Sequence, residues 1–248
     1  MSEKRYLIVN ADDFGQSHGV NRGIIEAFEN GIVTSASLMV RWPAAVEAAA
    51  YARAHAKLSV GLHVDLSEWA CENETWFPLY EVAPLDNHTA VAAEVQRQLE
   101  RFRELLGGNP THLDSHQHAH CKEPVRSVLQ QLSQELHVPL RHFSSRVRHG
   151  GEFYGQSAKG WPYPEGISVN GLMEVLTKLP SGIIELGCHP GWADDLESMY
   201  REERAAEVKT LCEARVRSFI EAAAITLCSF HDVTQTASLQ TMDCTPHE

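Results

Sequence analysis

The order of strand and helix patterns along this 248-residue chain predicts an α/β fold, a single-domain, distorted (β/α) barrel of the TIM type. Short apolar runs alternate with amphipathic helical patterns over the whole length, which requires parallel strands joined by crossovers rather than hairpins. Six or seven such units suit a closed or nearly closed barrel better than an open sheet. Polar residues gather where each apolar run ends, so the site is expected at the C-terminal ends of the strands.

Strands are predicted where apolar or β-branched runs are bounded by turn residues. The first run, residues 6–9, leads directly into the sequence Asn-Ala-Asp-Asp-Phe-Gly at 10–15. The predicted strands are residues 6–9, 34–40, 58–66, 111–116, 139–143, 182–188 and 225–230.

Helices are predicted where apolar residues recur at helical spacing between capping signals. Ser17 can cap a helix that runs through Phe28, Pro43 suits a first helical turn, and Gly107 closes the helix that begins at His88. The predicted helices are residues 17–28, 43–55, 88–106, 123–136 and 169–179, with two more inside 199–224.

Two long segments, residues 67–87 and 144–167, show no regular pattern and are expected to be loops. Loops of this length inside a compact domain are usually functional or mobile. The aromatic side chains of 67–87 suit either a lid or sugar platform, or a satellite hydrophobic cluster over the barrel. No linker or repeat marks a boundary, so we expect one catalytic domain over 1–248, with a polar, frayed tail from about residue 234.

Composition excludes several classes of partner. The net charge of −12 and a pI of about 5.6 argue against a nucleic-acid or anionic-membrane surface. No apolar run approaches the length of a membrane span, and no signal leader opens the chain. Six cysteines without a C-x-x-C pair suit a reducing compartment, so we expect a cytoplasmic protein.

The adjacent carboxylates of Asp12 and Asp13 follow the first predicted strand. In a regular strand neighbouring side chains point to opposite faces, so these two can share a site only where the pleat breaks. The Phe14-Gly15 turn is the expected position of that break. Two carboxylates at a strand end are costly unless a cation receives them, which indicates a metal site.

Histidines supply further ligands at other strand ends, namely His63, His189 and the run from His112 to His120. Every second residue of that run is His or Asp, and the period of two places them along one face of a strand. We expect His116, at the end of the strand, to reach the ion. His118 and His120 would then lie on the loop, as contacts to substrate or supports for the ligands.

A carboxylate with two imidazoles leaves coordination positions open for water and substrate, as hydrolytic metal sites require. Mixed nitrogen and oxygen donors suit one divalent ion such as Zn²⁺, Mn²⁺, Co²⁺ or Fe²⁺, and Mg²⁺ remains compatible. The sequence therefore predicts a metal-dependent hydrolase.

The chain resembles the YdjC/ChbG-type carbohydrate deacetylases over nearly its whole length. The resemblance rests on N-A-D-D-F-G (10–15), N-x-G-I-x-E-A (21–27), G-I-V-T-S (31–35), G-L-H (61–63), T-H-L-D-S-H-x-H-x-H (111–120) and C-H-P-G (188–191). It implies a distorted β/α barrel, one divalent metal ion such as Zn²⁺ or Mg²⁺, and a homodimer. The implied reaction removes the acetyl group from N-acetylated sugars such as chitooligosaccharides.

Carried over by motif, the resemblance implies site residues and their roles. Asp13, His63 and His116 match the metal ligands, Asp12 matches the general base, and His189 matches the general acid. In that mechanism the base takes a proton from the attacking water and the acid protonates the departing amine.

Two other functions fit the same residues. A metal-dependent phosphoesterase on a similar barrel would need more positive charge at the mouth of the site. A non-catalytic carbohydrate-binding protein would carry a structural ion with a closed set of four ligands. Arg141, at another strand end, is interpreted first as a buried partner for Asp114, and alternatively as a residue that orients Asp12.

Overall fold

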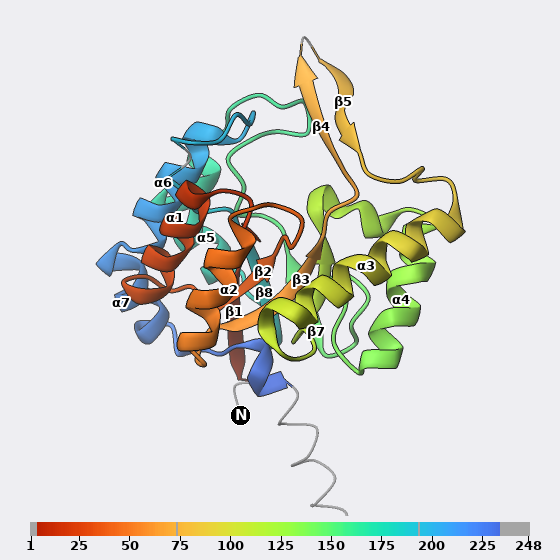
Figure 1. Cartoon of the computed structure of the whole chain (residues 1–248). Coiled ribbons are helices and arrows are strands. Elements are labelled where there is room, and N and C mark those ends of the chain that lie inside the picture. Colours follow the sequence, from red (N-terminus) through yellow and green to blue (C-terminus); the bar gives the residue numbers. More distant parts are fainter. Residues whose placement is uncertain (1–3, 73, 193, 234–248) are drawn as a thin grey trace, which may run out of the picture.

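A parallel β-sheet forms the centre of the computed structural model, which describes residues 4–72, 74–192 and 194–233 (Figure 1). The strand order is β6-β3-β2-β1-β8-β7, and β9 pairs with the N-terminal part of β1. The central strand β1 (Arg5–Phe14) pairs in parallel with β2 (Ser35–Leu38) and with β8 (Gly182–Cys188). The other strands are β3 (Ser59–Val64), β6 (Leu113–Ser115), β7 (Val147–Gly150) and β9 (Ile225–Leu227).

The sheet curls into a partial barrel, which confirms the predicted fold class. Every strand pair in it is parallel. An isolated parallel bridge from Leu113 to Leu140 continues the sheet beyond β6. Within the described ranges, β6 and β7 at the two ends of the strand order do not pair with each other, so the barrel stays open there.

Helices cover the outside of this sheet and bury their apolar faces against it (Figure 1). Two of the predicted end signals are confirmed: the Ser17 side chain accepts a hydrogen bond from the Val20 amide, and Gly107 ends its helix with φ 76°. The third is wrong, because α2 begins at Ala45 and Pro43 lies before its first turn. The helices are α1 (His18–Glu29), α2 (Ala45–Ala54), α3 (His88–Leu106), α4 (Val125–Leu136), α5 (Val169–Thr177), α6 (Arg201–Leu211) and α7 (Ala214–Ala222), with 3₁₀ turns η1 (His116–Cys121) and η2 (Pro164–Ile167). Among the helices that the structure describes, none has the length and hydropathy needed to cross a bilayer.

The prediction of an irregular loop at residues 67–87 is wrong. The strands β4 (Ser67–Glu72) and β5 (Thr75–Glu81) form an antiparallel hairpin that projects from the barrel (Figure 1). Trp76, Phe77 and Leu79 are exposed on β5. Because nearly all of β5 is exposed, it lacks the alternation of buried and exposed residues on which strand prediction depends.

Two more predictions need correction in the second half of the chain. The strand expected at 139–143 is reduced to the single bridge at Leu140, because the chain turns at His142, where φ is 66°. The loop expected at 144–167 contains β7 and η2. Strand β7 is the last in the sheet order and is only partly buried, so it needs few apolar residues. Its sequence therefore lacks the apolar run from which a strand is predicted. The predicted frayed tail lies outside the described residues.

Helix α1 lies unusually close to the loop that follows β8. A Cβ atom at Gly23 would lie 2.4 Å from the Cα atom of Gly191. The Trp192 amide also donates a hydrogen bond to the Gly19 carbonyl. This contact fixes the position of the loop that begins at His189.

Gly23→Ala is therefore expected to displace this loop and to lower the free energy of unfolding by about 1–3 kcal/mol, the usual cost of overpacking. Urea denaturation measures the change. Gly108→Ala is the control, because a Cβ atom there meets nothing within 4 Å. Equal stability of the two variants would show that the close approach does not constrain the loop.

Candidate active site

Strand β1 delivers two adjacent carboxylates to one cavity. Asp13 adopts φ 67°, and the pairing of β1 with β2 shifts register between Ala11 and Phe14. This irregularity interrupts the alternation of side chains, so Asp12 and Asp13 both line the cavity. The pleat breaks as expected, but at Asp13 itself rather than at the Phe14-Gly15 turn.

Asp13, His63 and His116 converge from β1, β3 and η1. The Oδ1 atom of Asp13 lies 3.2 Å from Nε2 of His63 and 2.9 Å from Nδ1 of His116. The three residues are at most 9% exposed, and each offers a donor atom within 4.8 Å of the others. The structure thus brings together the three residues that the sequence pointed to as metal ligands.

Surrounding groups hold this set in an orientation suited to a metal ion. Asp114 Oδ1 lies 2.8 Å from His63 Nδ1, which leaves Nε2 of that ring for an ion. Arg204 donates a 2.6 Å hydrogen bond to Asp13 Oδ2, so Oδ1 is the oxygen left for an ion. A buried group of two imidazoles and one carboxylate, with a carboxylate behind one imidazole, fits a divalent transition metal.

Arg141 joins three carboxylates from three strands. Its guanidinium contacts Asp12 through two hydrogen bonds of 2.6 and 2.7 Å, Asp114 Oδ2 at 2.9 Å and Glu185 Oε1 at 2.7 Å. These four side chains are at most 5% exposed. Both interpretations of Arg141 therefore describe real contacts, since it pairs with Asp114 and also orients Asp12.

These contacts set the charge of both aspartates. Burial alone would raise the pKa of Asp12, but attraction and hydrogen bonds from Arg141 hold it well below the ordinary value. Burial likewise opposes ionisation of Asp13, and Arg204 and His116 lower its pKa. Both carboxylates are therefore ionised at neutral pH, and Asp12 is a weak base.

His189 lies beside Asp12 at the other side of the cavity floor, with Nε2 3.8 Å from Asp12 Oδ2. The rings of Tyr154 and Tyr200 each lie 5.4 Å from its ring. Burial lowers the pKa of His189 to about 4, so the imidazole is neutral at pH 7. It must acquire a proton before it can act as an acid.

Sequence reasoning missed three buried ionisable residues of this site, Glu185, Arg204 and Glu207. Glu185 is a single acid within the apolar run of β8. An acid in such a run is rarely buried without a partner, so its position indicated a buried ion pair. Arg204 and Glu207 lie in the highly charged helix α6 yet are 2% and 0% exposed. Their local sequence resembles a solvated helix face, so it offers no such signal.

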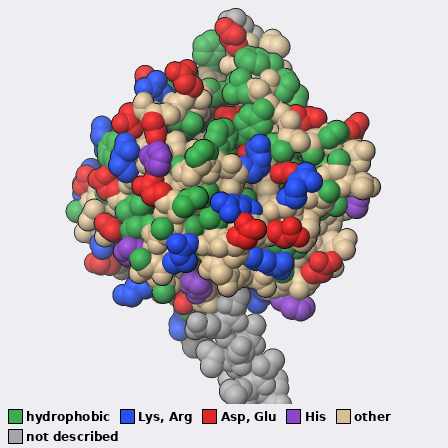
Figure 2. Space-filling view, viewed as in Figure 1, with side chains coloured by type: hydrophobic (Ala, Val, Ile, Leu, Met, Phe, Trp, Pro, Cys, Tyr) green, Lys and Arg blue, Asp and Glu red, His purple; other side chains and the backbone are tan. Residues whose placement is uncertain are grey.

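The cavity has a volume of about 970 Å³ and combines this charged floor with aromatic walls. The β4–β5 hairpin forms part of one wall, and Figure 2 shows hydrophobic side chains gathered over it. The η1 turn places His118 in the cavity lining, whereas His120 is buried with Nδ1 2.6 Å from the Ser115 hydroxyl. The aromatic residues that line the cavity are Trp69, Trp76, Phe153, Tyr154, Tyr163 and Tyr200.

Comparisons with known proteins agree on one family. A family model described as YdjC-like protein matches residues 6–222. A carbohydrate deacetylase from Geobacillus stearothermophilus is 35% identical over 237 residues, covering 84% of this chain and 90% of that protein. A chitooligosaccharide deacetylase from Citrobacter koseri is 33% identical over 254 residues, covering 93% of this chain and all of that protein.

One solved structure shares this fold. A protein from Enterococcus faecalis, described as a candidate cellobiose-phosphate cleavage protein, superimposes with a TM-score of 0.75 at 25% identity. The alignment covers 93% of this chain and 99% of that one. The fold is therefore shared over almost the whole length of both chains.

Arg141→Gln should expose the role of the buried guanidinium. At pH 7 the variant leaves buried carboxylates without a counter-ion, and we expect it to lose about 3–5 kcal/mol of unfolding free energy. In the wild type, stabilisation by Arg141 is present above the ordinary carboxyl pKa values of 3.8 and 4.5 and is lost as the pH falls. The difference between the two proteins should therefore stay near its full size from pH 7 to about pH 5, and shrink as the pH falls below about 4.

Urea denaturation at several pH values measures this difference. Arg97→Gln is the control, because Arg97 pairs with Glu94 but is 63% exposed. That variant should change stability by less than about 1 kcal/mol at every pH. A pH-independent loss in Arg141→Gln would contradict the electrostatic role of Arg141.

Proposed function

The chain belongs to the YdjC-like protein family, and we propose that it is a metal-dependent carbohydrate deacetylase with a single catalytic domain. It removes the acetyl group from N-acetylated sugars and releases acetate and an amino sugar. One observation carries the proposal. Asp13, His63 and His116 converge from three distant segments, and they share one cavity with Asp12 and His189.

Asp13, His63 and His116 would hold one divalent ion, Zn²⁺ or Mg²⁺, with Mn²⁺ and Co²⁺ as further candidates. When bound, such an ion supplies a Lewis acid that polarises the amide carbonyl and makes water a better nucleophile. Three protein donors leave positions open for reactants, unlike the closed set of four that a structural ion prefers.

Asp12 is the proposed general base. Arg141 keeps it ionised and fixes both of its oxygens, so its orientation is set before substrate binds. The low basicity of Asp12 means that it holds the proton of the attacking water only briefly. Asp12 Oδ2 lies 3.8 Å from His189 Nε2, so this proton can pass to the imidazole.

His189 is the proposed general acid. Its imidazole starts neutral, takes up the proton that arrives through Asp12, and delivers it to the departing amide nitrogen. This transfer matters because an amide nitrogen leaves badly without a proton. The lowered pKa of about 4 makes the imidazolium a strong acid, which suits that step.

The substrate class follows from the relatives and the cavity. The Citrobacter koseri relative is named for chitooligosaccharides, which are oligomers of N-acetylglucosamine. Aromatic walls such as Trp69 and Trp76 offer apolar faces on which sugar rings can stack. A phosphoesterase is less well supported, because the cations at the cavity floor, Arg141 and Arg204, already contact buried carboxylates.

The decisive test is an assay of acetate release from N-acetylglucosamine oligomers. The untagged protein should release acetate, lose activity after chelation, and recover it with Zn²⁺, Mg²⁺, Mn²⁺ or Co²⁺. Ca²⁺ is the control ion and should restore little activity, because it prefers six to eight oxygen ligands. Absence of release from every acetylated sugar would refute the proposed reaction, and release insensitive to chelation would refute its metal dependence.

Substitutions should separate catalysis from metal binding. Asp12→Asn and His189→Ala are expected to lower kcat by about 10²–10⁴-fold while the ion stays bound. Asp13→Ala and His63→Ala are expected to lose the ion from this site. Steady-state kinetics and metal analysis of each purified variant check both statements, with the exposed His88→Ala as the control. Near-normal kcat in Asp12→Asn would show that Asp12 is not the base.

A further inference from the structure

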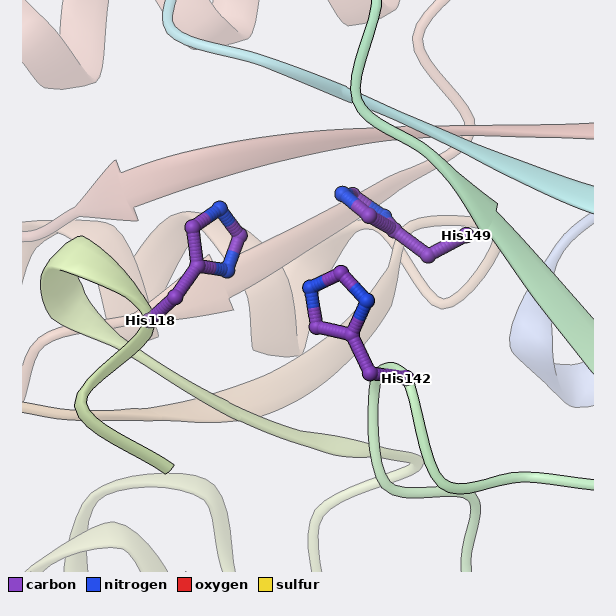
Figure 3. A group of neighbouring side chains, drawn as sticks. All are labelled: His118, His142 and His149. Carbon is purple, nitrogen blue, oxygen red and sulfur yellow. The ribbon is translucent and has the colours of Figure 1, made fainter. Parts of the chain in front are cut away.

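The proposed metal ligands Asp13, His63 and His116 form one group, called the Asp13 group below. A second group, made of imidazoles alone, consists of His118, His142 and His149. Each offers a ring nitrogen within 4.8 Å of the others, and no member belongs to the Asp13 group. Their ring centroids are separated by 5.1, 5.6 and 4.5 Å. Figure 3 shows the three rings approaching one another from η1, from the turn after Leu140 and from β7.

His149 is held in a manner suited to a metal ligand. Its side chain is 5% exposed, and Nδ1 lies 3.5 Å from Glu185 Oε2. A carboxylate beside one ring nitrogen orients metal-binding histidines and leaves the other nitrogen for the ion.

The backbone at the other two histidines adopts a costly conformation. His118 has φ 52° and His142 has φ 66°, both in the left-handed region. Such residues cost about 1–3 kcal/mol each and cluster at binding sites. No described side chain hydrogen-bonds to either ring, so contacts of that kind do not account for their placement.

We propose that His118, His142 and His149 bind a transition-metal ion of the kind that prefers imidazole, such as Zn²⁺, Ni²⁺ or Cu²⁺. Three nitrogen donors without a carboxylate disfavour Mg²⁺ and Ca²⁺, which select oxygen. His118 and His142 are exposed, so an ion can reach them from solvent. His118 and His149 also line the cavity, so the ion would lie at the edge of the proposed catalytic site.

Metal stoichiometry tests this site without reference to activity. Untagged protein is stripped with a chelator, equilibrated with Zn²⁺, freed of loose metal by gel filtration, and analysed for bound zinc per chain. The test variant is His118→Asn/His142→Asn, because asparagine tolerates the left-handed conformation but offers no imidazole. It should bind one fewer ion per chain than the wild type and keep the wild-type melting temperature within a few degrees.

The matched control is His137→Asn, an exposed histidine with φ 56° outside the group, which should bind as much zinc as the wild type. The variant Asp13→Ala/His63→Ala separates the two sites, because it removes ligands of the Asp13 group alone. Adding His118→Asn and His142→Asn to that variant should lower its zinc content by one further ion per chain. Equal zinc content in the wild type and His118→Asn/His142→Asn would overturn the proposal. If His118→Asn/His142→Asn does not fold, the single variant His142→Asn replaces it, and zinc content equal to that of the wild type would again overturn the proposal.

Discussion

The rest of the site depends on the ion pairs that the buried guanidinium of Arg141 makes with three carboxylates. The guanidinium lies among carboxylates of β1, β6 and β8, which would repel one another and resist burial without it. Because those strands are separated by long stretches of sequence, the ion pairs also fix their relative position at the sheet edge. Arg141 therefore has two roles. It compensates the charge of three buried acids, and it sets the orientation of the Asp12 carboxylate.

That charge arrangement extends to the proposed metal ligands. Asp114 contacts Arg141 through one oxygen and the His63 ring through the other, so it links the guanidinium to the group formed by Asp13, His63 and His116. The same arrangement limits the basicity of Asp12, the proposed base, because a carboxylate stabilised so strongly holds protons weakly. A weak base next to a neutral His189 favours a relay of one proton between the two groups over independent acid and base roles.

The chain has a second set of supports in α6, far from the first strands in sequence. Arg204 donates a hydrogen bond to Asp13 Oδ2, and Glu207 accepts a hydrogen bond from the backbone amide of His189. The close approach of Gly23 to the loop after β8 adds a steric constraint at the same place. One helix thus stabilises a proposed ligand and the proposed acid together, which couples their positions.

The sequence by itself determined the fold class, which depends on local patterns. Its motifs, through their resemblance to known deacetylases, pointed to Asp12, Asp13, His63, His116 and His189 as residues of one site. Strands in a parallel barrel end at one rim, so reactive residues at strand ends could be assigned to a common site without coordinates. Only the tertiary structure decided that Arg204 and Glu207 are buried in the site, that 67–87 forms a hairpin, and that a second histidine group assembles. Burial of a charge and pairing of an exposed strand depend on partners far away in sequence, and no local pattern encodes those partners.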